Sequence, residues 1–203
     1  RAELQLAGLL GENLADPFAI GVANGPGASL VPGSGPVTFQ IDSVINLNQI
    51  GELSAGSFPD DGQMPGIPGR TGGDDFIAAE VLTWLDLPAG KTTMGVNSDD
   101  GFRLSIGGAD LGDRFATTVA EFDGGREAGD TVFTIIVGQP GLYPARLVYE
   151  ERTGEASLEW FTLNTDGFKV LVNDVEKGGI PAYRLVQGEG RAVATKVVPE
   201  LGA

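Results

Sequence analysis

The stretch that decides the fold is VNSDDGFRLSIG, residues Val96–Gly107. Apolar residues alternate with polar ones in its second half, at Phe102, Leu104 and Ile106. This period of two predicts a strand with one buried face. Two adjacent carboxylates, Asp99 and Asp100, stand directly before that strand. Because like charges this close repel each other, the pair predicts either a fully solvated turn, whose side chains cap backbone amides, or a shared cation.

Further strand signals lie on both sides of this stretch. Residues 76–87 (FIAAEVLTWLDL) and 92–97 (TTMGVN) precede it, and 131–137 (TVFTIIV), 142–150 (LYPARLVYE), 157–163 (SLEWFTL) and 168–173 (FKVLVN) follow it. A run at 36–47 (PVTFQIDSVINL) is a weaker signal, and residues 2–10 (AELQLAGLL) are ambiguous between helix and strand. We expect successive antiparallel strands, and their spacing predicts an all-β antiparallel sandwich or barrel.

Two long glycine-rich loops interrupt these strands. The first covers residues 58–73 (FPDDGQMPGIPGRTGG), and the second is the acidic stretch 107–130. A loop as long as the first, inside a compact domain, is usually functional or covers another part of the fold.

The composition limits the functions open to the chain. Its 203 residues, 41% of them hydrophobic, suit one main domain. A net charge of −15 supplies no basic stripe, which argues against nucleic-acid binding. Because cysteine and histidine are both absent, thiol and imidazole chemistry and nearly all zinc or haem ligation are excluded, and oxygen-binding metals remain.

The same composition bears on membranes and on processing. No apolar run approaches the roughly 20 residues that span a bilayer, so we expect no membrane insertion. The chain starts at Arg1 without a methionine or a signal-like segment, and we expect a processed protein or a piece of a larger one.

The motifs around the aspartate pair resemble those of a known family. They are DDFIAAEVLTWLDLPAG (74–90), MGVNSDDGFRLSIGG (94–108) and GQPGLYPARLVYEERTGEASLEWFTL (138–163). Their combination resembles the PA14 domain, a β-sandwich of surface adhesins, toxins and glycosidases. The resemblance implies one PA14-like domain over residues 1–175 with its motif-bearing core at 75–173. Residues 176–203 would then be a C-terminal extension or a junction to a further module.

The resemblance also implies a metal site. In lectin-like PA14 domains, two neighbouring aspartates joined by a cis peptide bond hold a calcium ion that binds sugar hydroxyls directly. By position these are Asp99 and Asp100, with Glu151 offering a side-chain oxygen, Thr153 a backbone carbonyl and Glu155 a further oxygen. Calcium takes about 6–8 oxygens in irregular geometry, which suits this mixed set.

The resemblance places the sugar at the same residues. Asp99, Asp100 and Glu151 are the ones it implies for ligand binding. A neutral amide commonly stands where this chain has Glu151. The added negative charge should tighten calcium binding, but it crowds the space for a sugar diol.

Other acidic segments have plainer interpretations. Asp60–Gly62 predicts a simple turn, Asp74–Asp75 a solvated entry to a strand, and Asn164–Gly167 a hairpin turn. The last of these lacks the glycine at the sixth position that a calcium loop of the EF-hand type requires.

Aromatic and basic residues within the strands are expected to be structural. We expect Trp84 and Trp160 to pack in the core or at an edge rather than stack on a sugar. The Tyr143 hydroxyl should reach a backbone partner. Arg103 and Arg146 should lie on the polar side of their strands and neutralise nearby acids, an effect that is modest for exposed pairs.

These features together predict a calcium-dependent, lectin-like carbohydrate-binding module that works in adhesion. We expect it to be part of a secreted or cell-surface protein and to bind cell-surface or matrix glycans as partners. The alternative is a building block of an extracellular fibre or large surface protein, in which calcium is only structural or absent. Copies of the chain are then the partners, and strand addition to an exposed sheet edge is one route to a filament.

We expect no enzyme. Adjacent carboxylates on one turn suit a shared cation better than the opposite faces of a sugar ring. The sequence also has no nucleophile elbow, phosphate-binding glycine loop or dinucleotide fingerprint.

Overall fold

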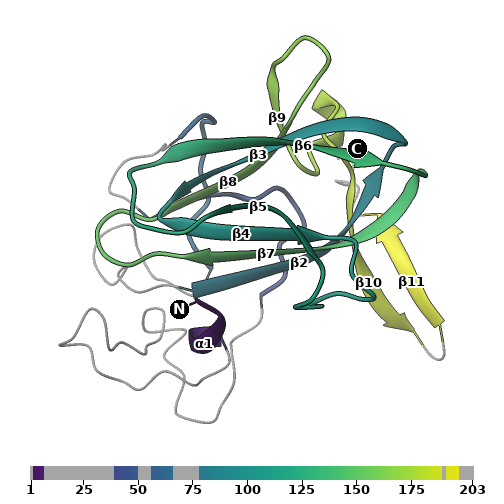
Figure 1. Ribbon diagram of the computed structural model, residues 1–203, viewed down its shortest axis with the longest axis horizontal. Helices are drawn as coiled ribbons and strands as arrows, with labels where there is room; N and C mark the ends of the chain where they lie inside the picture. Colours follow the sequence, from purple (N-terminus) through teal and green to yellow (C-terminus); the bar gives the residue numbers. More distant parts are fainter. Residues whose placement is uncertain (1, 7–38, 50–55, 66–77, 189–190, 197–203) are drawn as a thin grey trace, which may run out of the picture.

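The computed structural model describes residues 2–6, 39–49, 56–65, 78–188 and 191–196. Within them the chain forms two antiparallel sheets stacked as a sandwich (Figure 1). The five-stranded sheet has the order β1 (Asn46–Asn48), β8 (Ser157–Leu163), β3 (Gly90–Asp99) and β6 (Gly129–Val137), with β9 (Lys169–Leu171) paired to β8. The six-stranded sheet has the order β11 (Arg191–Lys196), β10 (Ala182–Gly188), β2 (Ala78–Leu87), β7 (Gly141–Glu150), β4 (Gly101–Ile106) and β5 (Thr117–Phe122). The predicted all-β sandwich is confirmed.

Strands that follow one another in the chain mostly lie in different sheets. Among the described strands, β2 pairs with β7 and β10, β3 with β6 and β8, and β4 with β5 and β7. The successive strands β2, β3 and β4 are antiparallel to their partners, as expected, but they do not pair with one another. Each has one apolar face, and crossing between the sheets lets these faces meet in a single core.

The core lies between the two sheets. Its largest fully buried side chains include Trp160 and Met94 from the five-stranded sheet and Leu104, Leu147 and Tyr149 from the six-stranded sheet. Burying one such side chain contributes about 1.5–3 kcal/mol to stability. The core position predicted for Trp160 is confirmed.

Aromatic side chains of the six-stranded sheet lie where the sequence predicts. Trp84 is half-buried and pairs with Tyr183 at the junction of β2 and β10. The hydroxyl of Tyr143 donates to the carbonyl of Gln139 at 2.6 Å, which is the predicted backbone contact.

The two weakest sequence predictions fail for the same physical reason. In the described part of the run at 36–47, residues 39–47, only Asn46 and Leu47 belong to a strand, and residues 39–43 are exposed and lie outside both sheets. The acidic stretch 107–130, in turn, contains β5, a strand whose residues are all exposed or half-buried. In neither segment do buried residues alternate regularly with exposed ones, so apolar alternation is a poor guide to it.

The described part of the loop at 58–73 covers the five-stranded sheet. Gly62 exchanges backbone hydrogen bonds with β1, donating to Asn46 at 2.8 Å and accepting from Asn48 at 2.9 Å. Glu159 of β8 accepts the backbone N–H groups of Ser57 and Phe58 at 2.8 and 2.9 Å. Ser57 and Phe58 therefore lie against Glu159 of β8, Gly62 continues the edge of the sheet beside β1, and Met64 reaches the core. Residues 66–73 of the loop are outside the described residues.

The C-terminal residues that the structure describes belong to the six-stranded sheet. A short 3-10 helix, η1 (Val175–Lys177), follows β9, and β10 then pairs with β2 through Ala182 opposite Leu85 and Tyr183 opposite Trp84. The hairpin of β10 and β11 thus extends the sandwich sheet. The domain division at residue 175 stays a prediction.

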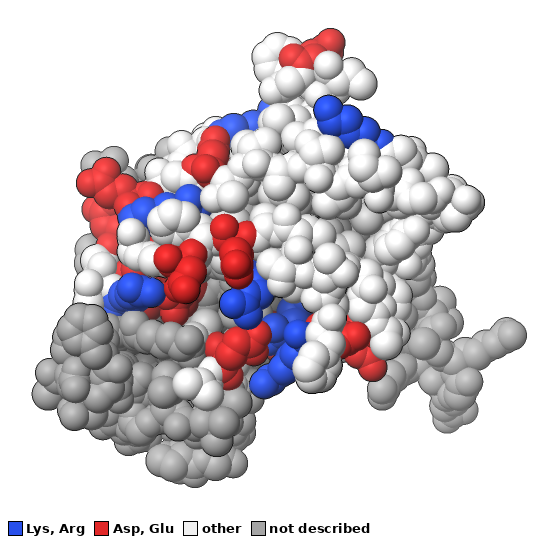
Figure 2. All heavy atoms as spheres, in the orientation of Figure 1, with Lys and Arg blue, Asp and Glu red and all other residues white. Residues whose placement is uncertain are grey.

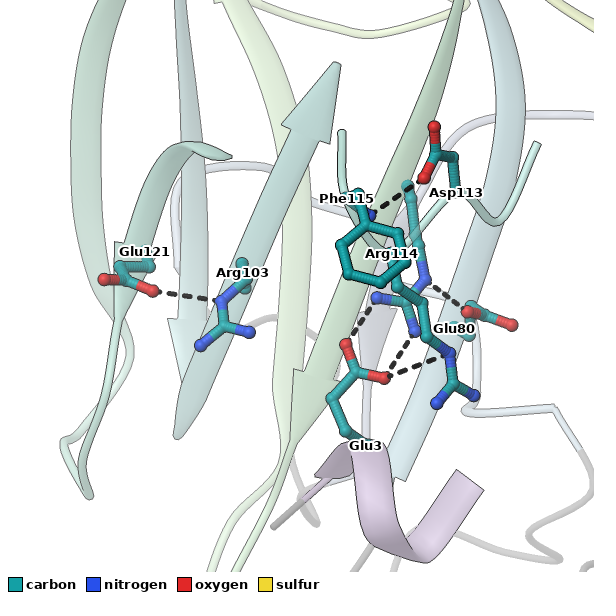
Figure 3. A network of polar contacts seen from close by, with 8 residues as sticks. Glu3, Glu80, Arg103, Asp113, Arg114, Phe115 and Glu121 are labelled. Atoms are coloured by element: carbon teal, nitrogen blue, oxygen red, sulfur yellow. Dashed lines mark hydrogen bonds and ion pairs between the residues drawn. The ribbon is translucent and has the colours of Figure 1, made fainter. Parts of the chain in front are cut away.

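A helix covers the outer face of the six-stranded sheet. Glu3 of α1 (Ala2–Leu6) accepts hydrogen bonds from Arg146, one of them at 2.8 Å, and Arg146 also pairs with Glu80 (Figure 3). Arg146 therefore neutralises nearby acids, as predicted, but it is only 4% exposed, because Glu3 of α1 lies against it, so the pair is buried and not at the surface. Arg103 and Glu121 do form the expected surface pair, at 3.0 Å.

Candidate metal centre

The aspartate pair lies where the chain crosses from one sheet to the other. Asp99 ends β3, and Gly101 begins β4. The register places Gly101 opposite Glu150 at the end of β7. It also places Asp99 opposite Ser157 at the start of β8. The loop between β7 and β8 therefore begins and ends beside the aspartates, although about fifty residues separate the two segments.

Three carboxylates converge at this point. Asp99, Asp100 and Glu151 each offer an oxygen, and these oxygens lie within 4.8 Å of one another. The exposed fractions of the residues are 9%, 5% and 0%, so all three are buried. The peptide bond between the aspartates is cis, as the resemblance implies. Glu151 lies beside the pair, where the resemblance places it.

Both oxygens of Asp100 accept backbone hydrogen bonds. The N–H of Arg126 donates to Oδ1 at 2.7 Å, and the N–H of Arg152 donates to Oδ2 at 3.0 Å. Because an ionised carboxylate has about four lone-pair sites, it can accept both bonds and still coordinate a cation. These contacts hold Asp100 between the loop after β5 and the loop after β7.

Asp99 is held in an environment that disfavours its negative charge. Burial, together with the charges of Asp100, Glu155 and Glu127, raises the pKa of Asp99 to about 7, although a hydrogen bond from the backbone of Ala128 opposes the shift. A cation held against this carboxylate would reverse the effect, because an opposite charge favours the ionised form.

A buried tyrosine fixes the backbone beneath the site. The Tyr149 hydroxyl donates to the carbonyl of Asp99, and Ser98 Oγ donates to the carbonyl of Asp100 at 2.7 Å. Burial raises the pKa of Tyr149 well above its ordinary value, so this hydroxyl remains a donor. Both aspartate carbonyls are thereby occupied by side chains.

The donor set fits calcium. Three buried carboxylates supply only hard oxygen ligands, which calcium prefers, and their mutual repulsion is offset when a dication lies between them. Asp99, Asp100 and Glu151 are the residues that would hold the ion. Thr153 and Glu155 are exposed in the same loop, and the carboxylate of Glu155 is not among the three that converge. Their predicted role as further ligands stays a prediction.

The segment 125–128, after β5, also contributes to the site, and the sequence analysis did not single it out. A Cβ on Gly125 would lie 3.3 Å from Asp100 Oδ1, so the backbone approaches this carboxylate closely. Arg126 and Ala128 then donate their N–H groups to the two aspartates, and Glu127 lies between them. The glycine pair in FDGGREAGD (122–130) is the one sequence signal that indicates such an approach.

The other acidic segments differ from the centre. Asp60 adopts a left-handed φ of 62° in a bend, in keeping with the predicted turn, while Asp61 is buried and accepts from Asn48 at 3.0 Å. Asn164–Gly167 closes the β8–β9 hairpin through a backbone bond of 3.0 Å, as predicted. Asp74 and Asp75 lie outside the described residues.

The fold and the carboxylate cluster define a class: two-sheet β-sandwiches with a buried acidic site at one end. No family model and no curated protein matches the chain. Among solved structures, it is similar to the "PA14 sugar-binding domain from RTX adhesin", with 21% identity over 51% of this chain and 55% of that one at a TM-score of 0.40.

Two further solved structures are similar to the chain. The PA14 domain of the antifreeze protein MpAFP has 16% identity over 57% of this chain and 50% of that one, at a TM-score of 0.40. The Epithelial Adhesin 9 A domain from Candida glabrata, in complex with Galb1-4GlcNAc, has 16% identity over 46% and 47%, at 0.39. The chain spans about half the length of these proteins. Two of the three are PA14 domains, the family that the sequence motifs resemble.

No helix among the described residues is long and apolar enough to cross a membrane.

Proposed function

We propose that this protein is a calcium-dependent carbohydrate-binding module that works in adhesion at a cell surface and carries out no catalysis. The observation that supports this most is the convergence of Asp99, Asp100 and Glu151 within 4.8 Å. Three oxygen donors leave part of a calcium coordination shell for other ligands, since calcium takes about 6–8 oxygens. Two neighbouring sugar hydroxyls would replace two waters there.

Each part of the site has a separate task in this proposal. Asp99, Asp100 and Glu151 bind the ion. The backbone N–H groups of Arg126 and Arg152 orient the Asp100 carboxylate, and the buried Tyr149 hydroxyl holds the Asp99 carbonyl. When bound, calcium supplies a Lewis-acidic centre for polyol oxygens. Cell-surface or matrix glycans are the proposed partners, and an extracellular location follows from that role.

Calcium binding is tested by calorimetric titration of the chelated protein. We expect one dominant site in the wild type and none in Asp100→Ala. Glu176→Gln, which removes an exposed acid on η1, is the matched control and should bind as the wild type does. Unchanged binding in Asp100→Ala would refute the assignment of the site.

Sugar binding is tested on a glycan array with and without chelator, using the protein as a monomer and as a clustered form. Little apolar area is buried when hydroxyls replace water, so the affinity of one copy should be about millimolar, or about −4 kcal/mol. Clustering should raise the apparent affinity by avidity. Silence of the clustered form with calcium present counts against a lectin.

A structural role is the second candidate, and two observations favour it. Glu151 is fully buried, and neither aspartate is more than a tenth exposed, which suits a closed structural ion. In the described part of the chain β6 ends the order of the five-stranded sheet, and its Val132 and Ile136 are 49% and 77% exposed. Such an edge can accept a strand from another copy. Subunits joined at this edge, together with silence on the array, would favour the fibre role.

A further inference from the structure

An acidic side chain next to the metal centre is held there by its neighbours. Glu127 is exposed, and its charge acts on Asp99. The residue before it, Arg126, donates its backbone N–H to Asp100 Oδ1 at 2.7 Å, and the residue after it, Ala128, donates its own to Asp99. With both neighbours bonded to the aspartates, Glu127 cannot leave the rim of the site.

A second acidic side chain lies on the other side of the centre. Glu155 is exposed, its charge also acts on Asp99, and it belongs to the loop that begins with Glu151. This loop is tied to the site by the backbone bond of 3.0 Å from Arg152 to Asp100. We call Glu127 and Glu155 the acidic rim.

The charge of Arg126 acts on Asp99 and Asp100, and its side chain is bonded beneath the site rather than to the rim. The guanidinium group of Arg126 donates to the carbonyl and hydroxyl oxygens of Ser98 at 2.9 and 2.7 Å and to Thr131 Oγ1 at 3.0 Å. It also lies over the ring of Phe122, 4.1 Å from the centroid. Each of its three nitrogens donates a hydrogen bond beneath the site, which holds the group there.

The second basic side chain is paired with other acids. Arg152 Nη2 lies 2.9 Å from Glu150 and 3.8 Å from Asp123. Acidic side chains gather at the end of the molecule where β3 and β7 terminate, as comparison of Figure 2 with Figure 1 shows. There are more carboxylates around the centre than guanidinium groups. The excess of negative charge is larger than the two positive charges that a bound dication supplies, so the site stays negative when it is loaded.

We propose that the acidic rim selects ligands by charge, so that the calcium-loaded site accepts uncharged or amine-bearing polyols and disfavours those that carry carboxylate or sulfate groups. This inference rests on the proposed carbohydrate function and specifies its ligand class. In water, a unit charge about 8 Å from another changes a binding constant by about 2.4-fold, so two rim charges give at least about fivefold discrimination at low salt. Salt screens the effect beyond a Debye length.

The test compares matched sugars that differ only in charge. The full chain loaded with calcium is titrated with methyl glucoside, galactoside and mannoside and with the corresponding uronides, and binding is followed by NMR. At low ionic strength we expect the neutral member of a pair to bind about fivefold more tightly. High salt, or the double variant Glu127→Gln with Glu155→Gln, should bring the ratio close to one, whereas Glu176→Gln should leave it unchanged.

A second readout uses calcium alone and does not depend on any sugar. Because the rim charges also attract the cation, the double variant should bind calcium at least fivefold more weakly than the wild type at low salt. Equal binding of neutral and anionic sugars by the wild type, or an unchanged calcium affinity in the double variant, overturns the rim proposal and leaves the metal site intact. If the protein binds calcium but no sugar, the proposed carbohydrate function is wrong. The proposal that the rim selects among sugars is then wrong as well.

Discussion

Asp99→Asn should stabilise the metal-free protein at neutral pH and abolish its response to calcium. Burial and the charge of Asp100 raise the pKa of Asp99 from 3.8 to about 7. The folded protein therefore holds this proton more tightly than the unfolded chain does. The stability that this tighter proton binding contributes is complete below pH 3.8, and it is lost as the pH rises to about 7.

The size of this loss follows from the same interval. Each pH unit between 3.8 and about 7 removes about 1.36 kcal/mol from the free energy of unfolding. Over the whole interval, the charge on Asp99 therefore costs the folded protein about 4 kcal/mol. Solvent lies close to the site, since the neighbouring Glu127 and Glu155 are exposed, and its screening reduces the expected cost to about 2 kcal/mol. Asparagine carries no charge, so the variant avoids this cost.

The assay is urea unfolding of chelated wild type and Asp99→Asn from acid to mildly alkaline pH. The wild type should lose about 2 kcal/mol more than the variant across the interval, and excess calcium should restore the wild type alone. The buried Glu159, whose pKa is also about 7, contributes equally to both proteins and cancels in the difference. Parallel pH curves for the two proteins, or an equal gain from calcium, would refute the reasoning.

Three further predictions concern the fold and its ion. Calcium at a hundredfold excess over its dissociation constant should raise stability by about 2.7 kcal/mol, and a melting curve indifferent to chelator contradicts this. Burial raises the pKa of Glu159 from 4.5 to about 7, so Glu159→Gln should remove part of the stability loss between these pH values in urea titrations; an unchanged slope would show that this carboxyl is not involved. Gly95→Ala places a Cβ 2.3 Å from the Phe161 ring and should cost about 1–3 kcal/mol in the same assay, whereas a neutral effect would mean that the ring moves freely.

The sequence by itself determined those strands that have one apolar face. Alternation predicted residues 157–163 as a strand, and β8 has these bounds. It also predicted β4 to within one residue at each end, and the turn residues of Asn164–Gly167 predicted the hairpin that follows β8. These features are local, because side-chain direction alternates within one strand and a turn depends on its own few residues.

The tertiary structure decided which strands pair and which distant side chains meet. Nothing in the local pattern predicts that Arg146 is buried, because the cover is supplied by α1 from the other end of the chain. The motif resemblance implied that Glu151 lies near Asp100, but the register of Gly101 opposite Glu150 brings it there. The rim residue Glu127 was missed for the same reason. Pairing between strands joins residues far apart in sequence, and no spacing along one segment encodes it.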